Sequence, residues 1–135
     1  MATLRTGAYG SYYGSSIGSS EPLSLAQMEV NAKYIYSFLT NAGWTVNAIA
    51  GMLGNIQAES TMNPGRWQSD TIGNAYLGYG LVQWTPSTKY TVWCLDRDLD
   101  PSAMDSNLER ILYELENNDQ WIATSSYNFS FKEFS

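Results

Sequence analysis

Apolar residues recur with a helical period in the first third of this chain. Between Leu25 and Asn41 the larger apolar side chains lie three, four or seven positions apart, the spacing of one apolar helix face. Ser24, followed three residues later by Gln27, fits a capping box at a helix start, and a glycine at position 43 is a typical helix stop. The pattern predicts a helix from about residue 25 to 41.

A second apolar stripe follows at once and predicts the buried helix of the fold. Thr45 is a suitable N-cap, and the apolar residues from position 46 to 56 again follow the 3.6-residue period. Glu59 comes three residues after Ile56, so its carboxylate should emerge at an edge of the apolar stripe.

From Asn63 to Gly80 the pattern changes to turn residues mixed with single aromatic residues. This mixture is typical of a small irregular hairpin or loop lobe. Thr85 followed by Pro86 predicts the start of another helix, which would place Trp93 and Cys94 in the core. Asp105 is a candidate N-cap for a further amphipathic helix.

The first 22 residues have a different composition. Met1–Ser20 is rich in Gly, Ser and Tyr and has little aliphatic periodicity, which is typical of a flexible arm or linker. We therefore expect an arm over residues 1–22 and one folded domain over residues 23–135, since 135 residues suit a single core.

The composition excludes several kinds of chemistry. The chain has no histidine and one cysteine, which removes histidine-based catalysis, an internal disulfide and the usual zinc sites, so no metal or cofactor is expected. A net charge of -6 argues against nucleic acid as a partner. No run of about 18 apolar residues is present to span a membrane. The 5 Trp and 10 Tyr would suit contacts with sugar rings.

Glu59 is the main candidate for catalysis. A carboxylate at the edge of a buried stripe experiences a low dielectric, which raises its pKa and would make it a proton donor near neutral pH. The alternative is that Glu59 only ends a helix on its solvent side. The periodicity alone favours neither interpretation.

Two short segments resemble those of known glycan-cleaving enzymes. Glu59-Ser60, in "GNIQAEST", and the Gly80–Gln83 segment, in "GYGLVQWTP", resemble the paired signature of goose-type lysozymes and lytic transglycosylases. With "NPGRWQ" between them, the chain resembles most closely the phage tail lysozyme family, over almost all of its length outside the arm.

The resemblance implies a mainly α, lysozyme-like α+β fold with a helical lobe and a small irregular β-hairpin lobe. It implies a muramidase that cleaves the β-1,4 bond between N-acetylmuramic acid and N-acetylglucosamine in peptidoglycan, with Glu59 as the general acid. Its place would be the virion, at the tail tip or tail knob, with other phage tail proteins as partners. The family domain normally continues into a further helical stretch, so by this resemblance we expect residues 23–135 to hold the domain without its C-terminal helical part.

The remaining site residues are less specific. Asp70 lies where lysozymes often place a second carboxylate, although a turn-forming aspartate is equally consistent with its surroundings. Gln83 is a candidate for hydrogen bonds to sugar, Tyr79, Trp67 and Trp84 for stacking, and Ser60 for a further substrate contact. Transglycosylation to 1,6-anhydro products and a non-catalytic glycan-binding or structural tail module are the alternative functions.

Overall fold

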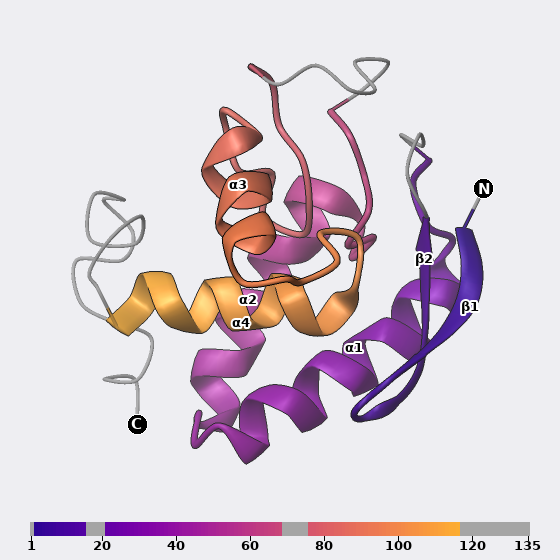
Figure 1. Cartoon of the computed structure of the whole chain (residues 1–135). Coiled ribbons are helices and arrows are strands. Elements are labelled where there is room, and N and C mark those ends of the chain that lie inside the picture. The colour runs from indigo at the N-terminus through magenta and orange to yellow at the C-terminus, as the bar shows by residue number, and fades with distance from the viewer. Residues whose placement is uncertain (1, 16–20, 69–75, 117–135) are drawn as a thin grey trace.

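A computed structural model describes residues 2–15, 21–68 and 76–116. The described chain contains a two-stranded antiparallel sheet and four α-helices (Figure 1). The strands are β1 (Ala2–Gly7) and β2 (Gly10–Ser15), and the helices are α1 (Leu25–Asn41), α2 (Val46–Ser60), α3 (Thr88–Asp96) and α4 (Met104–Glu116). The prediction of a mainly helical α+β fold is confirmed.

The first two helices begin and end as the sequence predicts. Ser24 and Gln27 form the reciprocal capping box: the Ser24 side chain accepts from the Gln27 backbone N–H, and Gln27 Oε1 accepts from the Ser24 backbone N–H at 2.9 Å. At α2 the Thr45 hydroxyl accepts from the Ala48 N–H at 3.2 Å. These caps satisfy backbone donors that have no partner inside the helix.

Both predicted caps further along the chain are wrong. Helix α3 begins at Thr88, because the Thr85 hydroxyl donates back to the Gln83 carbonyl at 3.0 Å and so caps nothing. Asp105 lies inside the first turn of α4. Its carboxylate accepts from the Ala8 N–H at 3.0 Å and from the Tyr34 hydroxyl. Asp105 is therefore engaged by tertiary partners, whereas Thr85 bonds locally, two residues back along the chain.

The expected structureless arm is also wrong for residues 2–15. These residues form the β1–β2 hairpin, with Ala2 opposite Ser15 and Gly7 opposite Gly10. The Tyr12 ring packs edge-on against the Tyr34 ring of α1, with 5.2 Å between centroids. Aromatic contacts to α1 therefore replace the aliphatic pattern that a strand would normally show.

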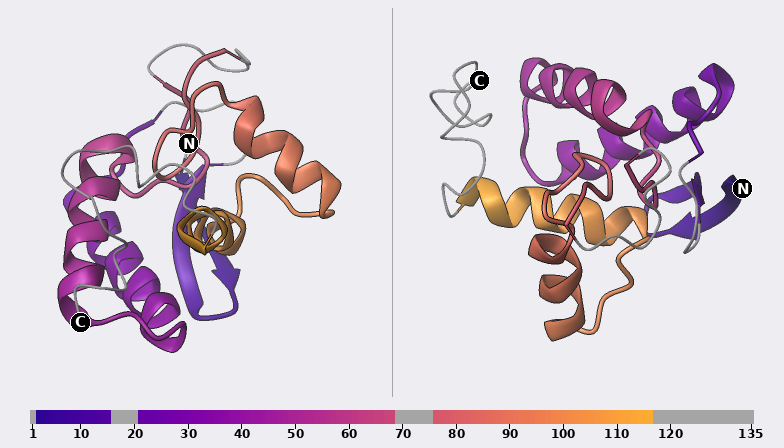
Figure 2. Two further views of the ribbon diagram at one scale, coloured as in Figure 1. Left: turned by 90° about the vertical axis from the view of Figure 1, so that its left-hand side faces the viewer. Right: turned by 90° about the horizontal axis from the view of Figure 1, so that it is seen from above.

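Helix α4 lies in the middle of the molecule. Figure 2 shows it between the α1–α2 pair on one side and α3 on the other. Cys94 is fully buried, as predicted, whereas Trp93 is half-buried at the border of the core. The Arg97 guanidinium packs over the Trp93 indole, with its central carbon 4.5 Å from the centroid of the ring. No helix of the described part has the length and apolar character needed to cross a membrane.

The irregular lobe is present as predicted, over the part of it that the structure describes. Isolated β-bridges join Trp67 to Tyr79 and Tyr79 to Trp84. The Gln68 N–H donates to the Gly78 carbonyl at 2.9 Å, which closes the two sides of the lobe. The lobe therefore rests on short bridges and not on a regular sheet.

Candidate functional site

The end of α2 presents Glu59 to solvent. Glu59 is the last residue but one of α2 and is exposed. The chain then leaves the helix through two successive left-handed residues, Thr61 with φ 50° and Met62 with φ 64°. The expectation that burial holds Glu59 in a low dielectric is wrong for the free protein. Its carboxylate is instead directly accessible to a ligand.

Ser60, next to Glu59, is turned into the protein. It is fully buried, and its hydroxyl donates to the Ile56 carbonyl of its own helix at 3.1 Å. A side chain so enclosed offers nothing to a sugar. The predicted substrate contact of Ser60 is therefore replaced by a structural role at the helix end.

Gln83 occupies a special backbone position in the second predicted segment. Its φ is 52°, in the left-handed region. Its side-chain amide nitrogen donates to the Arg66 carbonyl at 3.0 Å and to the Gly80 carbonyl at 2.8 Å. Among the described residues no group donates to its amide oxygen, which is the atom left for a ligand.

The two predicted segments meet at Arg66. Its backbone carbonyl accepts from the Gln83 side chain and from the Gly80 N–H at 2.9 Å. Its guanidinium lies 3.5 Å from the hydroxyl of Thr61, the C-cap residue that directly follows α2. Arg66 thus connects the helix end that carries Glu59 to the segment that carries Gln83.

The aromatic candidates are more enclosed than the sequence suggests. Trp84 is fully buried, donates its indole N–H to Glu114 at 2.8 Å and stacks on Tyr90 with 4.2 Å between centroids. It presents no ring face to a ligand, so its predicted stacking role is wrong. Tyr79 is only 3% exposed, and Trp67 is half-buried.

Trp67 and Tyr79 line a small pocket. Their ring centroids are 4.5 Å apart. The pocket has a volume of about 200 Å³ and a largely apolar wall. Its lining consists of Trp67, Tyr79, Thr91, Asp100, Pro101 and Ser102. It therefore lies where the irregular lobe, α3 and the loop before α4 come together.

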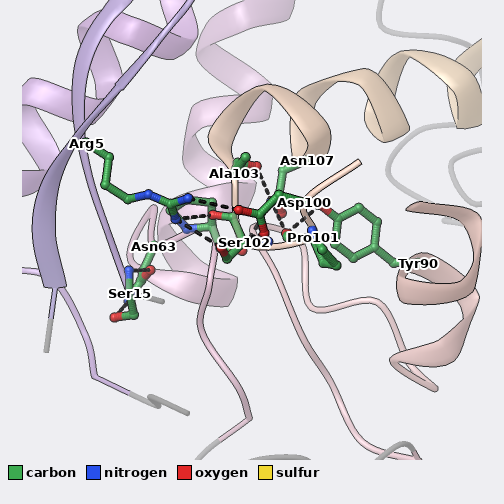
Figure 3. Close-up of polar contacts among 10 residues, drawn as sticks. Arg5, Ser15, Asn63, Tyr90, Asp100, Pro101, Ser102, Ala103 and Asn107 are labelled. Atoms are coloured by element: carbon green, nitrogen blue, oxygen red, sulfur yellow. Dashed lines mark hydrogen bonds and ion pairs between the residues drawn. The ribbon is translucent and has the colours of Figure 1, made fainter. Parts of the chain in front are cut away.

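The wall formed by the loop before α4 is held by the N-terminal hairpin. Arg5 of β1 donates to the Ser102 carbonyl at 3.0 Å and pairs with Asp100 at 3.2 Å (Figure 3). Burial raises the pKa of Asp100, but hydrogen bonds from Ser102 and the charge of Arg5 outweigh it, so the net pKa lies below its usual range. Asp100 is therefore a carboxylate at neutral pH.

Sequence reasoning missed the polar side chains that hold these parts in place. Asn107, in the first turns of α4, is fully buried and accepts from the Leu81 N–H at 2.9 Å. Its amide nitrogen donates to the Pro64, Pro101 and Ala103 carbonyls, the last two of which appear in Figure 3. The sequence offered one signal for Asn107: it lies four residues before Ile111, on the apolar face of the predicted helix. A polar residue that is also a poor helix former is unusual at such a position.

Asn63 plays a similar part behind the end of α2. Its amide oxygen accepts from the Ser15 N–H at 3.0 Å, and its nitrogen donates to the Ser15 hydroxyl at 2.8 Å. These bonds fasten the end of the hairpin to the turn after Glu59 (Figure 3). The second predicted carboxylate, Asp70, lies outside the described residues.

A helix that ends near an exposed glutamate is joined here to a Gly-Leu-Val-Gln segment of an irregular lobe. This arrangement defines the class of lysozyme-like α+β proteins. Residues 30–135 match the family described as phage tail lysozyme. The chain belongs to that family. It is also 56% identical over 112 residues to Morphogenesis protein 1 of Bacillus phage B103, a match that covers 83% of this chain and 30% of that relative.

Proposed function

We propose that this chain is a muramidase that cleaves the β-1,4 bond between N-acetylmuramic acid and N-acetylglucosamine in peptidoglycan. The observation that carries the proposal is the exposed carboxylate of Glu59 at the end of α2, next to the turn that Arg66 joins to Gln83. Membership of the phage tail lysozyme family supports the substrate class.

Glu59 is proposed to donate a proton to the glycosidic oxygen as the bond breaks. The free protein leaves this carboxylate in water, so the glycan strand itself must exclude water from it on binding. Gln83 would hold the strand through its amide oxygen, which can accept from a sugar hydroxyl or from the N–H of an N-acetyl group.

The second half of the reaction depends on what stabilises the oxocarbenium-like centre. Asp70 is proposed either to meet that centre or to position a water against it. Without a second carboxylate within reach, the N-acetyl group of the substrate would assist. Attack by the 6-hydroxyl group would instead give 1,6-anhydro ends, the products of a lytic transglycosylase.

A non-catalytic tail module is the second candidate. The relative from Bacillus phage B103 is named a morphogenesis protein, and this chain spans 30% of its length. A fold of this kind can also persist without turnover. In both cases we propose a place in the virion at the tail tip or knob, where the domain meets the host cell wall and other tail proteins.

The test compares Glu59→Gln with the wild type on purified cell walls by zymography. If Glu59 is the general acid, the rate falls by at least about 10²-fold with the fold unchanged. Glu29→Gln, which alters an exposed glutamate of α1, is the matched control and should retain activity. Clearing by Glu59→Gln at the wild-type rate would contradict the assignment.

Two further readouts separate the alternatives. Mass spectrometry of the released glycans distinguishes reducing ends, expected for a muramidase, from 1,6-anhydro ends. Wild-type protein that pellets with the walls without clearing them would favour the binding module.

A further inference from the structure

The turn that follows Glu59 has an unusual backbone. Thr61 and Met62 have left-handed φ values of 50° and 64°, and neither is glycine. A left-handed conformation brings the Cβ atom too close to the following carbonyl oxygen, and it is least tolerated by β-branched residues such as threonine. Two such residues in succession stay in place only where their surroundings hold them. The turn therefore needs partners outside α2.

Asn31 of α1 is one of these partners. It is fully buried, and its amide nitrogen donates to the Met62 carbonyl at 2.9 Å and to the Tyr13 carbonyl at 2.7 Å. Its amide oxygen accepts from the Tyr13 N–H, also at 2.7 Å. An asparagine amide has two N–H groups and one oxygen. This one side chain therefore joins β2 of the hairpin to the turn after Glu59.

Two further bonds reach the same turn from the N-terminal part of the chain. The Leu23 N–H donates to the Thr61 hydroxyl at 2.8 Å. The Ser15 N–H donates to the Asn63 side-chain oxygen at 3.0 Å (Figure 3). The family match begins at residue 30, so the hairpin and Leu23 lie outside it. Much of the support of this turn therefore comes from a part of the chain that the family match does not include.

We propose that Asn31 is a positioning residue for Glu59. Its bond to the Met62 carbonyl keeps the turn left-handed, and the turn fixes the end of α2, where Glu59 stands three residues before Met62. Without this bond the turn would relax toward the conformations that L-residues prefer, and the carboxylate would move relative to Gln83. The inference rests on the proposed muramidase function and adds the N-terminal hairpin to the parts that place its general acid.

The position of a general acid affects the rate more than it affects binding. Proton transfer requires the acid to lie within hydrogen-bond reach of the glycosidic oxygen, whereas a glycan strand is bound through many contacts. A misplacement of about 1 Å can cost on the order of 10²-fold in rate. Loss of the bond from Asn31 should therefore lower kcat by about 10- to 100-fold and change KM by less than about 2-fold.

The test measures initial rates of Asn31→Asp over a range of cell-wall concentrations, which separates kcat from KM. Aspartate keeps the size of the side chain and an oxygen for the Tyr13 N–H, but it loses the amide N–H groups. Asn31→Ser, which removes the amide without adding a carboxyl group, is the second variant. Both variants should lower kcat.

Leu39→Ala is the matched control for stability. Leu39 is also a fully buried residue of α1, but it lies near the other end of that helix. Its loss should destabilise the fold by creating a cavity and should leave kcat unchanged at temperatures at which the variant is folded. An equal fall of kcat in Leu39→Ala would overturn the proposal, because the effect would then be one of general stability.

Backbone NMR reads the turn directly, since the HN–Hα couplings and chemical shifts of Thr61 and Met62 depend on φ. Both Asn31 variants should move these signals toward right-handed or extended values, and Leu39→Ala should not. An unchanged turn, or wild-type kcat in folded Asn31 variants, would overturn the proposal. The NMR result does not depend on turnover, so a wild type that fails to clear cell walls while its turn responds to Asn31 would contradict the muramidase proposal alone.

Discussion

Replacing Asn107 with alanine should lower the free energy of unfolding by about 3 kcal/mol, if three net hydrogen bonds of about 1 kcal/mol each are lost. The count follows from the geometry: the Asn107 oxygen accepts from the Leu81 N–H, and its two N–H groups serve the carbonyls of Pro64, Pro101 and Ala103. The residue is fully buried, so water cannot replace these bonds without entering the core.

Two opposing effects modify this value. The stranded Leu81 N–H adds a desolvation cost of about 1–3 kcal/mol, whereas alanine has a higher helix propensity than asparagine by roughly 0.5 kcal/mol. For a domain of ordinary stability, about 5–15 kcal/mol, a loss of this size is large. The melting temperature should fall by about 10 °C, given a few degrees per kcal/mol at this chain length.

Urea unfolding followed by tryptophan fluorescence measures the change, and an unchanged m-value would show that the unfolding transition still exposes the same surface. Asn47→Ala is the control, because Asn47 is exposed in the first turn of α2 and should change stability by less than about 0.5 kcal/mol. If Asn107→Ala lost less than about 1 kcal/mol, the argument that Asn107 holds the Leu81 segment, the turn at Pro64 and the loop before α4 together would be refuted.

Three further outcomes follow from the charges and titratable groups. Arg5→Ala should be less stable than wild type at neutral pH. Because the folded pKa of Asp100 is lowered, this difference in stability should shrink as the pH falls below about 4, which pH-dependent unfolding measures. A difference that stays constant to pH 2 would count against the ion pair. Burial, and then the bond to Asp105, raise the pKa of Tyr34. The protonated Tyr34 hydroxyl should therefore stabilise the fold fully below about pH 10 and progressively less as the pH rises above it. Tyr34→Phe should lessen this alkaline loss of stability in a circular dichroism titration. Lysis by the free domain, whose net charge is -6, should rise with added salt, since screening weakens repulsion from anionic wall polymers; strong lysis at low salt that falls with salt would point to attraction instead.

The sequence by itself determined the helices whose signals are local. The bounds of α1 and the cap of α2 follow from side chains that bond to backbone a few residues away, so no distant partner was needed to find them. The apolar stripes predicted the core, including the buried thiol of Cys94. The sequence also pointed to the Glu59-Ser60 end of α2 and to the Gly80–Gln83 segment, because both are short motifs of consecutive residues.

Only the tertiary structure decided which polar and aromatic side chains are available to a ligand. Asp105 is of a residue type that often caps helices, but its carboxylate accepts from Ala8, 97 positions away, which only the folded chain brings near. Trp84 is fully buried in the core, whereas Trp67 lines a pocket.

The N-terminal hairpin depends most strongly on distant contacts. Arg5 meets Asp100 across 95 positions of the chain, and Ser15 meets Asn63 across 48. An isolated two-stranded hairpin is marginal in water, so its own composition suggested an arm. Its packing on α1 and its bonds to the pocket wall supply the stability that no local pattern along residues 2–15 reveals.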